Sequence, residues 1–446
     1  MSPISQLLLV LAIIVVASKL AGSVAGRIGQ PPVFGEILVG LMLGPTLFDL
    51  LHWFPAHGGH PTFLADTVHA LSEVGVVLLM FLAGLETDLP GVRKVGYAAL
   101  LAASGGVVLP LVLGAAAAYL YSGYGIYPAI FVGTILTATS VSISAQTLLE
   151  MGKLRTQEGG TILGAAVIDD VIGIIVLSLV IAFKPETAGA TAVPESLVDW
   201  VMTVATPHLG TGAVPGAFRV TMLVLLMATF FYGFIRLGFR WMEPLLARSD
   251  RIGVSRDTTA MALALAFVAA VAAEWIGSVA AITGSYMAGL AMGSTTYKER
   301  LEQKFKTLCY AFFVPCFLVG IGLRADARPL VMPLFGQGDM HFFWSTLLII
   351  FVAITAKVAG CWAGARLAGF PNLASWRVGV GMISRGEVGL IVASVGLRAQ
   401  VIDQQAFSAM VIMVLATTLV TPPLLKLAFR HAPHKSGRRP AAHTPD

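Results

Sequence analysis

The sequence predicts an all-α protein that crosses a membrane many times, with about thirteen transmembrane helices. Hydrophobic residues make up 57% of the 446 residues and charged residues only 12%, whereas an ordinary soluble domain carries about 25% charged residues. The mean hydropathy is +0.83. The apolar residues form continuous runs of about 20, which suit membrane-spanning helices better than the alternating segments of about ten residues that are typical of a membrane β-barrel.

Each predicted span is an apolar run able to cross most of about 30 Å of hydrocarbon. In order along the chain, the runs cover 5–23, 33–49, 68–85, 97–120, 127–148, 159–183, 219–239, 259–274, 277–294, 308–323, 343–365, 377–397 and 406–427. Residues 1–430 are therefore expected to form a single transmembrane unit. Residues 431–446 are expected to form a basic cytoplasmic tail without stable structure.

Lysine and arginine residues orient the spans, because they are retained on the cytoplasmic side. Of the 29 such residues, 21 lie in connections after odd-numbered spans or in the tail. The connections after even-numbered spans carry five, namely Lys184, Arg219, Arg324, Arg328 and Arg398. This asymmetry predicts an external N-terminus and a cytoplasmic C-terminus.

The formal net charge of +5 does not indicate a nucleic-acid partner, because the basic residues are scattered between apolar runs. The three cysteines all fall inside apolar runs, so no disulfide framework is expected. No cluster of residues points to a structural metal or a cofactor. The partner that composition predicts is the lipid bilayer.

Two pairs of similar segments indicate an internal repeat. The third span ends MFLAGLETDLPGV (80–92), and the tenth ends CFLVGIGLRADARPLV (316–331). These copies are seven spans apart, so they enter the membrane in opposite directions, as in the inverted repeats of many secondary transporters. Two spans after each copy, TATSVSIS (137–144) and GMISRGEVGLI (381–391) predict helices broken within the membrane.

Five ionisable residues are predicted to lie near the middle of the membrane. Asp169 and Asp170 are adjacent in the sixth span, Lys357 lies in the eleventh, and Arg385 and Glu387 lie in the twelfth. An ionised Asp at this depth costs about 2.5–3.5 kcal/mol, so adjacent acids indicate a functional site. For the Arg385 and Glu387 neighbourhood, buried ion pairs that merely fix helix packing are an equal alternative.

The adjacent aspartates suggest an exchange mechanism. Neighbouring helical residues point about 100° apart, so one carboxylate can face Lys357 while the other faces a cavity. Two carboxylates in a site of low dielectric constant ionise together only with a compensating cation, so a proton and a cation compete. Oxygen ligands for Na⁺ or Li⁺ are expected from both aspartates and from the first broken helix, where the candidate residues are Thr137, Thr139 and Ser140. The same ligands leave K⁺ as an alternative cation.

Taken together, the motifs resemble those of the cation:proton antiporter superfamily, in its second-family branch of bacterial and archaeal sodium/proton exchangers. The motifs are GQPPVFGEILVGLMLGP (29–45), FLAGLETD, TATSVSIS, the aspartate pair, Lys357 and SRGEVGLIVASVG (384–396). The resemblance covers residues 5–427 and implies thirteen helices, with interleaved core and dimerisation subdomains. It also implies two crossing broken helices, elevator-type alternating access, a homodimer and a place in the cell (inner) membrane.

The resemblance further assigns roles to single residues. It implies that Asp170 is the principal ion- and proton-binding carboxylate, and that Asp169 is the partner of Lys357. A paired Asp together with this Lys implies electrogenic exchange. Glu387 matches a family glutamate in the second broken helix, where a structural or pH-related role is expected.

Sodium(lithium)/proton antiport by a transporter that is not an enzyme is the function expected, with potassium/proton antiport as the alternative. Two other classes are weaker alternatives. An intramembrane aspartyl protease needs two acids that face one peptide bond from different helices, which adjacent residues do not provide. A cation channel needs neither a proton-binding pair opposed by a Lys nor an alternating gate.

Overall fold

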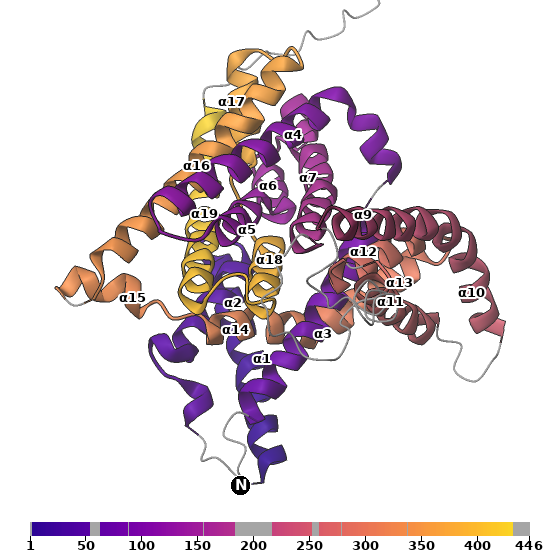
Figure 1. The fold of residues 1–446 in the computed structure, drawn as a ribbon, viewed down its shortest axis with the longest axis horizontal. Helices are drawn as coiled ribbons and strands as arrows, with labels where there is room; N and C mark the ends of the chain where they lie inside the picture. Colours follow the sequence, from indigo (N-terminus) through magenta and orange to yellow (C-terminus); the bar gives the residue numbers. More distant parts are fainter. Residues whose placement is uncertain are drawn as a thin grey trace, which may run out of the picture.

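The computed structural model describes residues 2–430 except 54–62, 88, 155, 183–215, 252–257, 278 and 337. Every regular element in those residues is a helix (Figure 1). The helices of the first half are α1 (Pro3–Arg27), α2 (Pro32–Leu41), α3 (Phe63–Glu86), α4 (Leu89–Leu120), α5 (Ile126–Thr137), α6 (Val141–Glu150), α7 (Gln157–Ala182) and α9 (Gly216–Gly233). Those of the second half are α10 (Phe239–Arg251), α11 (Thr258–Trp275), α12 (Ala281–Met292), α13 (Lys298–Leu308), α14 (Val314–Arg324), α15 (Arg328–Val331), α16 (Met340–Leu367), α17 (Asn372–Gly381), α18 (Glu387–Arg398) and α19 (Gln404–Arg430).

The predicted class is confirmed, because each predicted span falls on one helix or on two consecutive helices. Eight helices in the described part of the chain are long and apolar enough to cross a membrane. The remaining predicted spans are short, as α2 and α12 are, or are divided between two helices, as in α5–α6 and α17–α18. The predicted tail, 431–446, lies outside the described residues.

Two predicted loop segments are wrong in detail, because charged helices continue beyond the apolar runs. The tenth span begins at Lys298, where α13 runs into α14 through a π-helical turn, Cys309–Phe313. Leu301 and Phe305 bury one face of α13, which explains why a charged segment stays helical. Likewise α10 continues from α9 through the π-helical turn Phe234–Gly238.

Arg377 was expected at a loop boundary, but it lies inside α17. Its guanidinium Nη1 is 2.9 Å from Glu158 Oε1 on α7, and its charged end lies over the ring of Phe429 at 4.9 Å. These partners compensate for the loss of water around the guanidinium, so the helix extends past the charge.

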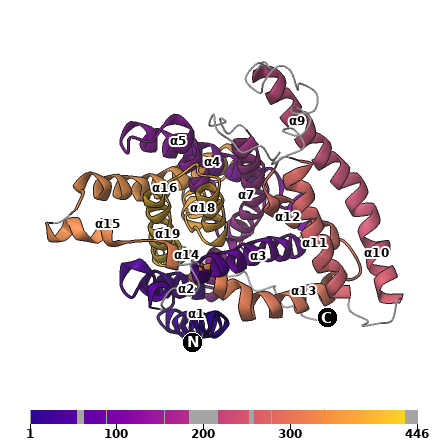
Figure 2. The same cartoon turned by 60° about the horizontal axis from the view of Figure 1, so that its bottom comes forward.

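The helices pack in two groups, which we call the α3 group and the α16 group. The α3 group contains α1, α2, α3, α11, α12, α13 and α14, while the α16 group contains α4, α5, α6, α7, α16, α17, α18 and α19. Figure 2 shows α4, α5, α16 and α18 together, with α1, α2 and α3 below them. Contacts between the groups are few and involve mainly α14 or α2 against α18 or α19. We call this boundary the seam.

Glycines bring α4 and α16 into direct backbone contact within the α16 group. A Cβ atom at Gly360 would lie 2.1 Å from the carbonyl oxygen of Gly105, and one at Gly105 would lie 2.2 Å from that of Gly360. At Gly106, a Cβ atom would lie 3.5 Å from Lys357 Nζ. The glycines therefore allow α16 to present Lys357 directly to α4.

Candidate functional site

The two broken helices cross at their non-helical segments, as the sequence predicts. The first break lies between α5 and α6 at residues 138–140, and the second between α17 and α18 at residues 382–386. The backbone N–H of Ser140 donates to the carbonyl oxygen of Ser384 at 2.8 Å. In return, the Ser384 hydroxyl donates to the carbonyl oxygen of Ser140 at 2.9 Å. The crossing thus satisfies backbone groups that the breaks would leave without partners.

A third serine strengthens the crossing. Ser144 Oγ on α6 donates to the carbonyl oxygen of Gly381 at 2.5 Å and lies 3.0 Å from Ser384 Oγ. The sequence prediction did not single out Ser144 or Ser384 as site residues. Their signal was present, since both lie within the two segments that were predicted to be broken.

Lys357 is fully buried and joins three other helices to α16. Its Nζ atom donates to the carbonyl oxygens of Gly106 on α4 at 2.9 Å and of Thr137 on α5 at 2.5 Å. Its third hydrogen bond, also 2.9 Å, goes to Asp169 Oδ1 on α7. All three ammonium hydrogens therefore have an acceptor. The predicted ion pair of Lys357 is present, with side-chain exposures of 0% for Lys357 and 1% for Asp169.

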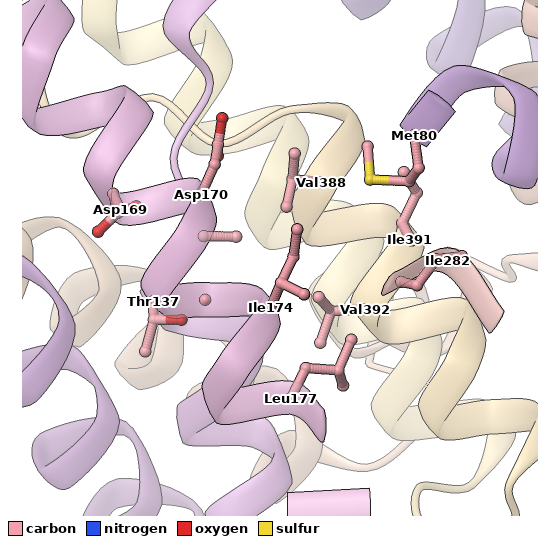
Figure 3. A pocket seen from close by; sticks show the side chains of 12 residues that line it. Met80, Thr137, Asp169, Asp170, Ile174, Leu177, Ile282, Val388, Ile391 and Val392 are labelled. Atoms are coloured by element: carbon pink, nitrogen blue, oxygen red, sulfur yellow. The ribbon is translucent and has the colours of Figure 1, made fainter. Parts of the chain in front are cut away.

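Asp169 and Asp170 point in different directions, as adjacent helical residues should. Figure 3 shows the Asp169 carboxylate turned away from that of Asp170. Both residues line a cavity at the seam, but only Asp169 has the lysine partner. The cavity wall is otherwise mostly apolar; Met80 and Ile282 come from the α3 group, and Thr137, Ala138, Gly173, Ile174, Leu177, Val388, Ile391 and Val392 come from the α16 group.

Arg385 forms no ion pair with Glu387 among the described residues and bonds to backbone carbonyls instead. The Arg385 side chain is fully buried. Its guanidinium donates to backbone carbonyl oxygens of the two broken helices and α16, namely Leu136 at 2.7 Å, Ile383 at 2.9 Å and Ala353 at 2.8 Å. Helix C-terminal ends carry partial negative charge, so Arg385 is a fixed cation that compensates the ends of α5 and α17.

Several oxygens close to the site have no hydrogen-bond partner among the described residues. They include Asp170 Oδ1 and Glu387 Oε2. Thr137 contributes its carbonyl to Lys357, while its hydroxyl donates to the carbonyl oxygen of Thr134 at 2.8 Å. Ser140 contributes to the crossing of the broken helices. The structure therefore gathers the predicted residues around one crossing, but in different roles.

This arrangement supplies a carboxylate whose charge is not already neutralised. Asp169 is paired with Lys357, whereas Asp170 borders the cavity and its Oδ1 atom has no donor among the described residues. An ionised carboxylate in an apolar setting needs a counter-charge, which a bound proton or a small cation can provide. The two ligands exclude one another at such a group, and this is the chemistry of exchange.

Comparison with known proteins agrees with this chemistry. A family described as "Sodium/hydrogen exchanger, transmembrane" matches residues 10–430. The Na(+)/H(+)-K(+) antiporter GerN of Bacillus cereus is 36% identical over 419 residues, which cover 94% of this chain and 95% of that protein. The high-affinity Na(+)/H(+) antiporter NhaS3 of Synechocystis sp. is 33% identical over 470 residues, which cover 99% of this chain and 94% of that protein.

A solved structure gives the same fold. The sodium proton antiporter MjNhaP1 from Methanocaldococcus jannaschii matches with a TM-score of 0.61 over 95% of this chain and 96% of that chain. The sequence identity is 14%, so this likeness concerns the fold alone.

Proposed function

Because the chain belongs to the sodium/hydrogen exchanger family, we propose that it exchanges cytoplasmic Na⁺ or Li⁺ for external protons. The chain is a multi-pass membrane protein and a cation/proton antiporter, which makes it a secondary transporter and not an enzyme. The protease alternative is excluded by this membership, and a channel is not the activity of the relatives named above.

The observation that carries the proposal is the difference in surroundings between the two aspartates. Lys357 neutralises Asp169, with their charged atoms 2.9 Å apart. Asp170 has no such partner and lines the cavity. We assign proton and cation binding to Asp170, with Asp169 and the hydroxyl of Thr139 as further ligands. In this assignment the protons and the cation compete for one site, which obliges the protein to exchange them.

Electrogenic exchange is supported by the buried lysine. If Lys357 releases its proton when Asp169 takes part in cation binding, the pair adds a proton to the one that Asp170 carries. Charge then moves across the membrane in each cycle, because the protons outnumber the sodium ions. Glu387, at the start of α18, is assigned a supporting electrostatic role, since its Oε2 atom has no hydrogen-bond partner among the described residues.

Elevator-type movement is supported by the packing of the helices. The site residues belong to the α16 group, and the cavity lies where this group meets the α3 group across the seam. A sliding movement of one group against the other would carry Asp170 between the two faces of the membrane. We further propose a homodimer in the inner membrane, with the N-terminus outside and the C-terminus in the cytoplasm.

Potassium/proton exchange is the second candidate. This candidate has specific support, since the name of the Bacillus cereus relative GerN includes K(+) as well as Na(+). Oxygen ligands such as those of Asp170 and Thr139 accept either alkali cation, so the identity of the residues alone does not choose between them.

The test is proton movement in proteoliposomes after addition of Na⁺, Li⁺ or K⁺, with the membrane potential either clamped or free. A response to Na⁺ or Li⁺ that changes with the potential is the expected result. A response to K⁺ alone that is indifferent to the potential would instead establish electroneutral potassium/proton exchange. No response to any of the three cations would refute the proposal.

A further inference from the structure

Four charged or titratable side chains meet at one end of the seam, away from the aspartate pair. His69 and Glu73 lie on α3, Arg324 on α14 and Arg398 on α18. Glu73 Oε1 is 2.9 Å from His69 Nε2 and 3.3 Å from Arg398 Nε. Arg324 Nη1 is 2.8 Å from His69 Nδ1. We call these four residues the seam cluster. Its Glu73–Arg398 ion pair joins the α3 group to the α16 group.

The seam cluster adjoins the cavity that contains Asp170. A second cavity is lined by all four cluster residues and by α18 residues that include Ile391. Ile391 also lines the cavity that contains Asp170. The two cavities therefore adjoin along α3 and α18, and the cluster occupies the position between Asp170 and the end of the bundle at which α18 finishes.

Other polar contacts cross the seam at this same end. The Gln404 side-chain amide on α19 donates to the carbonyl oxygen of Arg324. The backbone N–H of Asp326 donates to Ser408 Oγ at 3.0 Å. Separation of the two helix groups at this end must break these contacts together with the ion pair.

The hydrogen bonds of the cluster form a chain from α14 to α18. Arg324 Nη1 lies against the His69 ring, 2.8 Å from Nδ1 and 3.1 Å from Nε2. His69 Nε2 lies against Glu73 Oε1, and Glu73 also accepts from Arg398 Nε. The Glu73 carboxylate thus connects the side chains of both helix groups.

Resting on the proposed function, we propose that the seam cluster is the gate that closes the ion route between Asp170 and the outside. The Glu73–Arg398 ion pair is the contact that must break when this gate opens. The predicted orientation places this end of α18 outside, where the exchanged protons are taken up.

The exposure of the cluster suits a contact that opens repeatedly. The side chains of His69, Glu73 and Arg398 are 31%, 35% and 37% exposed. Ion pairs at such positions contribute little to stability because water competes for both partners.

The test measures access to the cavity and not transport. Val392 lines the Asp170 cavity and is 5% exposed, so Val392→Cys reports on reagents that pass the cluster. The variant is labelled with a charged, membrane-impermeant methanethiosulfonate, applied to each face of sealed vesicles. The three native cysteines are fully buried, and the parent chain without the Val392 change gives the background.

In the Val392→Cys chain, Glu73→Gln and Arg398→Gln are each expected to raise labelling from the outside about threefold, the size expected from the loss of one partly exposed ion pair. Asp326→Asn is the matched control. Partial burial acts to raise the pKa of Asp326, but hydrogen bonds from Arg328 hold this pKa below its ordinary value. That ion pair lies at the same end but does not cross the seam, so its loss should leave labelling unchanged.

Equal labelling in Glu73→Gln, Arg398→Gln, Asp326→Asn and the parent Val392→Cys chain would overturn the gate, even if cation/proton exchange were measured. Labelling that responds as expected in a protein without exchange would refute the proposed function and leave the gate intact.

Discussion

The two ion pairs that bridge helices near the seam differ in the way that water reaches them. Lys357 and Asp169 are fully buried, and Lys357 gives its other two hydrogens to backbone carbonyls. Glu73 and Arg398 are each more than a third exposed. A buried pair is costly to break, because removal of one partner leaves an uncompensated charge away from water. An exposed pair costs little to break, because water solvates the charge that remains. The comparison indicates that the middle of the α16 group is fixed and that the end of the seam can move.

The largest effect is expected at the carboxylate without a partner. Asp170→Asn keeps the size of the side chain but can bind neither a proton nor a cation as an ionised group. We expect exchange in proteoliposomes to fall to the rate of protein-free liposomes, while thermal unfolding of the purified protein changes little. Asp326→Asn, which neutralises a carboxylate outside the Glu73–Arg398 ion pair, should retain exchange. If Asp170→Asn keeps full activity, the assigned mechanism is wrong.

The next largest effect is on stability and compares the buried pair with an exposed one. Lys357→Ala should destabilise the protein by about 3–5 kcal/mol, because it leaves Asp169 buried without a counter-charge. Lys306→Ala is the control; Lys306 is 43% exposed and pairs with Glu86 and Glu302, so its removal should cost about 0–1 kcal/mol. Unfolding in detergent by denaturant or heat measures both.

A double variant makes this test specific to charge. Lys357→Ala combined with Asp169→Asn removes both charges, so it should regain much of the stability that Lys357→Ala loses. If the double variant is as unstable as the sum of the two single variants, packing and not charge explains the loss.

Close packing of α4 and α16 should have an intermediate effect. Gly360→Ala would place a Cβ atom 2.1 Å from the Gly105 carbonyl oxygen, so the helices must separate at a cost of about 1–3 kcal/mol. Gly26→Ala is the control, because nothing lies within 4 Å of a Cβ atom there. The thermal shift of the two variants measures the difference. Equal stability would show that α16 is less tightly held than the comparison requires.

The smallest effect is expected at the crossing of the broken helices. Ser384→Ala removes the hydrogen bond from Ser384 Oγ to the carbonyl oxygen of Ser140, at a cost of about 0.5–1.5 kcal/mol. Thr355→Ala is matched to it, since the exposed Thr355 hydroxyl bonds only to its own helix, at Phe351. If Ser384→Ala loses no more stability than Thr355→Ala, the hydrogen bond at the crossing does not help to hold the site fixed.

Apolar periodicity and charge were enough to predict the fold class, because a membrane allows few ways to satisfy a backbone. The broken helices were predictable for the same reason, since Ser and Thr runs and paired glycines are unusual in the middle of a span. An ion pair between Lys357 and one of the two aspartates was also expected, because isolated charges at that depth need partners. The choice of Asp169 was implied by the family resemblance.

Other parts of the site had no signal in the sequence. Lys357 and Arg385 bond mainly to backbone carbonyls, and a carbonyl looks the same at every residue. The seam cluster joins His69 to Arg324, which are 255 positions apart, and only the packing of α3 against α14 brings them together. The start of the tenth span at Lys298 was not predictable from apolar runs, because α13 is a charged helix and contains no such run.

The central claim is that a proton and a cation compete for Asp170, and calorimetry tests this directly. Na⁺ is titrated into the purified protein at fixed pH in two buffers whose ionisation enthalpies differ, so that the difference in heat counts the protons released. Wild-type protein should release protons as it binds Na⁺, and Asp170→Asn should show neither the binding heat nor the release. Na⁺ binding without proton release, or unchanged release in Asp170→Asn, would contradict the account.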